Sequence, residues 1–150
     1  MKKFGIQLGA FLVALLAVII LGSLFHTQFV LNALPVPTPV SLSDNISTSL
    51  FDMISMGPLY GGIMGIGLLI AFFIAIYVTK LAPSLRWLVY GVAGFVAVIA
   101  TLLIMEASLG LMPIAGARTM AGLLMQGVAG AVAGYVFTRI SPARSSDQTA

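Results

Sequence analysis

The sequence predicts an all-α integral membrane protein, with four transmembrane helices in an up-down bundle and a short amphipathic helix in the first external loop. Of its 150 residues, 60% are hydrophobic and only 7% are charged, whereas soluble domains carry about 25% charged residues. The apolar residues gather in four long runs that lack the two-residue alternation of barrel strands, so helices are the expected spanning elements. We expect one transmembrane domain over 1–140 and a disordered cytoplasmic tail over 141–150.

Each apolar run is long enough to cross the roughly 30 Å of bilayer hydrocarbon, which takes about 20 helical residues. The predicted spans are about 4–25, 58–79, 87–106 and 119–138. Lys2 and Lys3 before the first run resemble the start of a signal peptide, but the run exceeds the usual apolar region of about 7–15 residues. We therefore expect an uncleaved signal anchor.

The basic residues predict the orientation of the spans, because cytoplasmic loops are enriched in Lys and Arg. In a four-span topology six of the seven fall on one side, and the other side holds only Arg118. The six are Lys2, Lys3, Lys80, Arg86, Arg139 and Arg144. This asymmetry predicts a multi-pass protein of the cell inner (plasma) membrane with both termini in the cytoplasm. Tyr77 and Trp87 then lie near the inner boundary and Tyr60 near the outer one, as an aromatic belt requires.

The external loop before the second span contains a helix-like pattern over about 42–56. Leu42, Ile46 and Leu50 lie on one arc of a helical wheel, and Asp44 and Asp52 lie opposite. This predicts a short amphipathic helix on the outer membrane surface or over the bundle. A mobile loop with scattered hydrophobic residues is the alternative.

Glycines at four-residue spacing mark faces on which helices can approach closely, and GxxxG packing of this kind is common in membrane proteins. One row lies on the second span and another, interrupted by Gln126, on the fourth. A shorter row, Gly5 and Gly9, lies on the first. The predicted helix-packing residues are Gly57, Gly61, Gly65, Gly122, Gly130 and Gly134. Packing inside one bundle, a homodimer interface and a close-approach site for a lipid or quinone all fit these rows.

A few polar residues interrupt the apolar pattern near the predicted outer boundary. Glu106 follows Arg86 by roughly 30 Å of helix and Arg118 precedes Arg139 by roughly 31 Å, so the two lie at one height. His26 reaches a similar level, and Pro113 and Gly116 are expected to make the turn between the last two spans. The candidate ligand or ion-pair cluster is Glu106, Arg118, His26, Asp52 and Gln126. A structural ion pair, a ligand or proton site, and unpaired solvated side chains are the alternatives, and Gln126 is expected to bond to a neighbouring helix.

Several classes of chemistry are disfavoured by the composition. The chain has no cysteine, so disulfides and thiolate sites are excluded, and one histidine with four carboxylates makes a metal site unexpected. We find no nucleotide-binding or hydrolase motif, and the basic residues flank apolar runs instead of forming a nucleic-acid patch. We therefore expect no cofactor and no enzymatic activity.

Two classes of function remain. The first is a non-enzymatic protein that acts through helix packing, as a homo-oligomer or an accessory subunit of a larger membrane complex. The second is a ligand-handling protein, a small transporter or a quinone- or lipid-binding subunit, with its polar site at Glu106, Arg118 and His26. Membrane lipid is a partner in either case.

Overall fold

The computed structural model describes residues 2–33, 42–55, 57–112 and 114–141. The regular elements in these ranges are all helices, and four of them are long and apolar enough to cross a membrane. Ser141, the first residue of the predicted disordered tail 141–150, is described and buried, which differs from the prediction. The rest of that tail, 142–150, and the predicted turn residue Pro113 lie outside the described residues.

The described part of the chain forms five α-helices and two short 3-10 turns. They are α1 (Lys2–Ala33), α2 (Leu42–Ser55), α3 (Gly57–Thr79), η1 (Pro83–Leu85), α4 (Arg86–Leu109), η2 (Ala115–Ala117) and α5 (Met120–Ile140). The last three predicted spans agree with α3, α4 and α5 to within a few residues. α1 is longer than the predicted 4–25, because the polar residues that end its apolar run are themselves compatible with a helix.

The α4–α5 connection begins with a glycine in the left-handed conformation. Gly110 has φ 70° and its N–H donates to the carbonyl of Glu106 at 2.9 Å, which ends α4. At the far side of the connection the Thr119 hydroxyl accepts from the N–H of Gly122 at 3.0 Å and caps α5.

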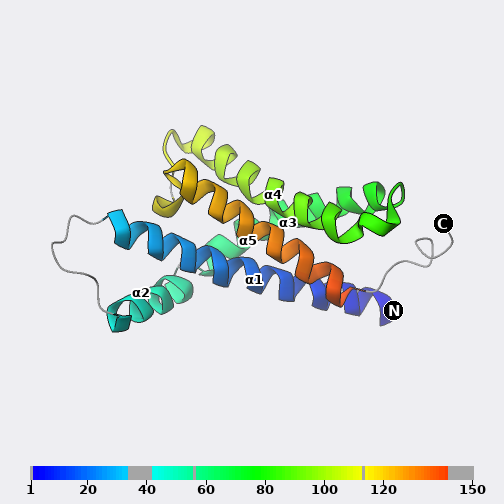
Figure 1. Ribbon diagram of the computed structural model, residues 1–150, viewed down its shortest axis with the longest axis horizontal. Helices are drawn as coiled ribbons and strands as arrows, with labels where there is room; N and C mark the ends of the chain where they lie inside the picture. Colours follow the sequence, from blue (N-terminus) through cyan, green and yellow to red (C-terminus); the bar gives the residue numbers. More distant parts are fainter. Residues whose placement is uncertain (1, 34–41, 56, 113, 142–150) are drawn as a thin grey trace.

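α5 lies at the centre of the assembly and packs against α4 and α1, while α3 packs against α4 and α1 (Figure 1). The start of α1 and the end of α5 lie at the same end of the molecule (Figure 1). We call this end, which also carries the α3–α4 turn, the Arg86 end. The opposite end, with the α4–α5 connection, is the Arg118 end.

α4 and α5 meet backbone to backbone through glycines. A Cβ atom added to Gly130 would lie 2.8 Å from the carbonyl carbon of Gly94 and 2.6 Å from Cγ2 of Val98. A Cβ added to Gly134 would lie 3.0 Å from the N atom of Gly91. The fourth-span glycines are therefore occupied by packing inside the chain.

α1 uses two different surfaces along its length. Its buried face is made by Ala10, Ala14 and Val18, which are spaced four residues apart and fully enclosed. Gly5 and Gly9, which the glycine spacing had marked as a packing row, have no neighbouring atom within 4 Å of an added Cβ. On this part of α1 the enclosed small residues are the alanines, whereas Gly5 and Gly9 face away from the bundle.

The glycine row of α3 faces side chains of α1. A Cβ on Gly61 would lie 3.0 Å from Cγ1 of Ile19, whereas one on Gly57 would reach Cγ2 of Ile19 at 3.4 Å. Gly65 would meet Cδ1 of Leu15 at 3.4 Å. The contact is tight at Gly61 and ordinary at the other two.

Near the Arg86 end the core is aromatic. The ring centroids of Phe72, Tyr90 and Phe137 lie 4.8 to 5.3 Å apart, and Phe11 meets Phe72 edge-on at 6.2 Å. The cluster joins α1, α3, α4 and α5. Two of its pairs, Phe11–Phe72 and Phe72–Tyr90, have the edge-on geometry that aromatic rings favour.

α2 packs against α1 and α3. Its apolar side chains Ile46, Leu50 and Ile54 are nevertheless exposed. Asp52 belongs to this helix, and its side chain lies outside what the structure describes.

Candidate functional site

Gln126 is a fully enclosed polar side chain of the spans, with 0% of its surface exposed. Its Oε1 accepts from the hydroxyl of Tyr60 at 2.7 Å, and its Nε2 donates to the carbonyl of Gly22 at 3.0 Å. One side chain of α5 is thus bonded to both α3 and α1. Both functional ends of the amide have a partner, and in the apolar interior such bonds have no competition from water.

Tyr60 was expected in the outer aromatic belt, and the structure places it inside the bundle instead, only 8% exposed. The reason is Gly22, since a Cβ there would lie 2.7 Å from Cζ of the Tyr60 ring. The missing side chain on α1 makes room for the ring and brings its hydroxyl to Gln126. Sequence reasoning missed both residues, because Gly22 belongs to no glycine row and Tyr60 occurs where belt residues occur.

His26 lies one helical turn beyond Gly22 on α1. Its Nδ1 accepts a hydrogen bond from the backbone N–H of Gly116 at 3.1 Å. A Cβ on Gly116 would lie 2.6 Å from Cα of His26, so only glycine lets η2 approach α1 this closely. Gly116 therefore contributes a docking contact between the α4–α5 connection and α1, in addition to any role in the turn.

Arg118 is held by its own connection. Its Nε donates to the carbonyl of Met112 at 3.2 Å, and its side chain is exposed, as is that of Glu106. Between these two described residues the structure contains no ion pair, which differs from the structural pairing that the sequence suggested. An exposed ion pair adds little stability, on the order of 0–1 kcal/mol, so a backbone carbonyl competes well for the guanidinium.

The structure thus divides the five candidate residues. Gln126 and His26 make successive contacts along one face of α1, whereas Glu106 and Arg118 stay at the exposed edge and do not pair. The position of the Asp52 side chain falls outside the described part of the chain. Within that part, no three His, Cys, Asp or Glu side chains come together as a metal site would require.

Comparisons with known proteins do not add to this picture. Neither the family models, nor the curated proteins, nor the solved structures contain a match to the chain. Any functional conclusion therefore rests on the geometry.

At the Arg86 end a second polar contact closes the bundle. Nη1 of Arg86 donates to the carbonyl of Thr138 at 3.3 Å, and Nη2 donates to the carbonyl of Ser141 at 3.1 Å. The guanidinium also lies 5.6 Å from the centroid of the Tyr90 ring. A cation of α4 thus satisfies carbonyls at the C-terminal end of α5, where the helix dipole favours positive charge.

We expect Arg86→Gln to lower the free energy of unfolding by about 1–2 kcal/mol, because the bonds to Thr138 and Ser141 are charge-assisted. The variant should remain folded, since the packing of α4 on α5 is unchanged. The measurement is unfolding by sodium dodecyl sulfate in mixed micelles, followed by fluorescence of Trp87. Arg139→Gln removes the same charge from the same end without these bonds and is the control. Equal losses of unfolding free energy in the two variants would contradict a stabilising role for the bonds from Arg86 to the end of α5.

Proposed function

We propose that this chain is a non-enzymatic, polytopic protein of the cell inner membrane that works through helix packing, as a homo-oligomer or as an accessory subunit of a larger complex. In this proposal the four long helices form an up-down bundle across the membrane, with the Arg86 end and both termini in the cytoplasm. α2 would lie as an amphipathic helix at the opposite interface, where its exposed apolar residues would meet lipid.

The observation that carries the proposal is the closed centre around Gln126. The side chain is fully enclosed and bonded on both sides, and among the described residues no buried side-chain nitrogen or oxygen lacks a partner. A transporter or a ligand-handling subunit needs polar groups that a solute can reach. Here the polar groups of the interior already bind one another, which favours a packing role.

The open face of α1 supports an interaction with another helix. Gly5 and Gly9 lie on this face with no neighbour, and Leu12, Leu16 and Ile20 continue it at helical spacing, all exposed. In lipid, small residues let two helix backbones approach, and α1 offers this surface to a second chain instead of to its own bundle.

The ligand-handling alternative has less support. His26 is engaged by Gly116 and Arg118 by Met112, so two of its three residues hold the connection to the bundle. Glu106 alone would remain as a recognition group, and one exposed carboxylate does not define a binding site.

The test uses Gly9→Leu on the complete chain. We expect wild-type protein in mild detergent to give an oligomer, or a complex with another membrane protein, in native mass spectrometry. Gly9→Leu should reduce that species at least about tenfold, because the larger side chain holds the second backbone away. The fold should survive, since nothing lies within 4 Å of an added Cβ.

Gly62→Leu is the matched control. Gly62 also lies on a long apolar helix and also has open space around an added Cβ, but it is on α3. Gly62→Leu should form the oligomer or complex in the same amount as the wild type. A wild-type protein found only as an unaccompanied monomer would contradict the packing proposal, and equal loss in both variants would remove α1 as the interface.

A further inference from the structure

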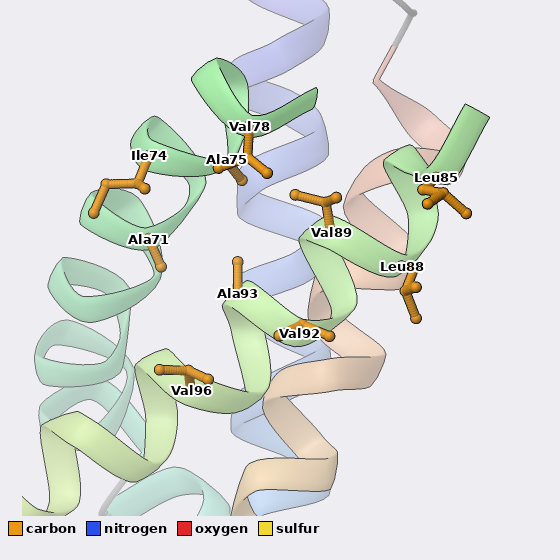
Figure 2. Close-up of a pocket in the computed structure, with 10 residues that line it drawn as sticks. All are labelled: Ala71, Ile74, Ala75, Val78, Leu85, Leu88, Val89, Val92, Ala93 and Val96. Carbon is orange, nitrogen blue, oxygen red and sulfur yellow. The ribbon is translucent and has the colours of Figure 1, made fainter. Parts of the chain in front are cut away.

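A groove outside the closed centre lies between α3 and α4 and is not used by the proposed packing of α1. It has a volume of about 410 Å³ and is lined only by Ala, Val, Leu and Ile side chains of these two helices and of η1. Figure 2 shows Ala71 and Ala75 of α3 on one side and Val89 and Ala93 of α4 on the other. The volume falls in the range of ordinary ligand pockets, about 300–1,000 Å³.

The groove exists because α3 and α4 touch closely at one level. Gly67 leaves room for the side chain of Thr101, and a Cβ there would lie 3.6 Å from the carbonyl oxygen of Ala97. From this contact the groove extends toward the Arg86 end, where Val78 and Leu85 line it on either side of the α3–α4 turn. The turn therefore lies at this end of the groove, which we call its mouth.

The length of the groove matches one leaflet. From Leu85 to Val96 the lining extends over eleven residue-to-residue steps, or about 16 Å along a helix. Half of the hydrocarbon thickness of a bilayer is about 15 Å. An acyl chain that enters from the Arg86 side would fill the groove and end near Gly67.

The mouth of the groove carries a positive charge. Lys80 lies in the turn, exposed, with its Nζ 5.0 Å from the centroid of the Tyr77 ring. Arg86 is already bonded to the end of α5. Among the described side chains the one carboxylate is that of Glu106, which lies at the opposite end.

We propose that the α3–α4 groove binds one anionic phospholipid of the leaflet at the Arg86 end, with an acyl chain in the groove and its phosphate beside Lys80. The apolar groove fits an acyl chain, and Lys80 at its mouth fits an anionic phosphate. Basic pockets between transmembrane helices bind anionic headgroups in this way. A zwitterionic lipid shares the acyl chain but gains less from Lys80.

The test is native mass spectrometry of delipidated protein titrated with a phosphatidylglycerol or with a phosphatidylcholine of the same acyl chains. We expect wild type to bind the first phosphatidylglycerol about fivefold more tightly than phosphatidylcholine, the factor expected of one lysine beside an anionic headgroup. Lys80→Gln should bind both lipids alike. Arg139→Gln, which removes a cation from the same end but away from the groove, should keep the preference.

A second pair of variants separates the groove from lipid that merely surrounds the protein. Ala93→Phe fills the groove and should weaken the first binding event at least about tenfold, because the acyl chain loses its place. Ala131→Phe makes the same change in the apolar groove of about 380 Å³ between α4 and α5 and should bind like wild type. If Ala93→Phe lowers the thermal midpoint, Val96→Trp, at an exposed lining position, repeats the test.

Three results would overturn the proposal. They are wild-type affinity in both groove variants, equal weakening by Ala93→Phe and Ala131→Phe, and equal affinity of wild type for the two lipids. Failure here leaves the oligomer test untouched, because Gly9 lies on α1 and the groove lies between α3 and α4.

Discussion

Gly130→Leu is expected to lower the free energy of unfolding by about 3 kcal/mol or more, the upper end of the usual cost of overpacking. An added Cβ would meet the backbone of Gly94 on α4, and backbone cannot rotate away as a side chain can. The two helices would have to separate along their length, which would also break the contact of Gly134 with Gly91. The readout is thermal unfolding in detergent followed by circular dichroism.

The control for this prediction is Gly62→Leu. It places the same side chain on a long apolar helix at a position with open space, and leucine favours a helix over glycine by about 0.8–1 kcal/mol. Gly62→Leu should therefore unfold at or above the wild-type temperature. A Gly130→Leu protein as stable as wild type would show that α4 and α5 do not approach through their glycines.

Gln126→Leu is expected to lower the free energy of unfolding by about 2 kcal/mol, because it leaves the buried hydroxyl of Tyr60 without its acceptor. Tyr60→Phe should cost about 1 kcal/mol, the usual worth of one hydrogen bond between transmembrane helices. The double variant should cost less than the sum of the two, since no hydroxyl is then left unpaired. We expect a coupling of about 1 kcal/mol in the double-mutant cycle.

Gln7→Leu is the matched control for the cycle. Gln7 is half-buried near the start of α1, and its loss should change the free energy of unfolding by no more than about 0.5 kcal/mol, as for most partly exposed positions. Unfolding in mixed micelles, with Trp87 as the fluorophore, gives all four values. Additive costs for Tyr60→Phe and Gln126→Leu would mean that the two side chains do not interact.

The polar residues show where sequence reasoning succeeds and where it stops. Gln126 could be singled out because a strong hydrogen-bonding group inside an apolar run needs a partner in lipid. Its partners could not be named, because Tyr60 and Gly22 lie 66 and 104 residues away along the chain. Glu106 and Arg118 were placed at one height, but height alone does not bring two side chains into contact, and Arg118 turns to Met112.

The glycine rows carry the same lesson. Spacing of four residues identifies a face of a helix, and the rows on α3 and α5 do face neighbouring helices. The row of Gly5 and Gly9 has the same spacing and faces open space. Which of these faces is covered depends on the rotation of each helix about its axis, and spacing along one helix contains no information on that rotation.

The sequence by itself determined that the chain is helical, that four segments are long and apolar enough to cross a membrane, and where three of them begin and end to within a few residues. These properties follow from local hydropathy, since about 20 consecutive apolar residues have one favourable arrangement in lipid. Only the tertiary structure decided that Tyr60 lies inside, that Gly116 docks on His26, and that α3 and α4 enclose a groove. Those features depend on the depth, rotation and crossing of helices distant in the chain, which close packing selects among many arrangements of similar hydropathy.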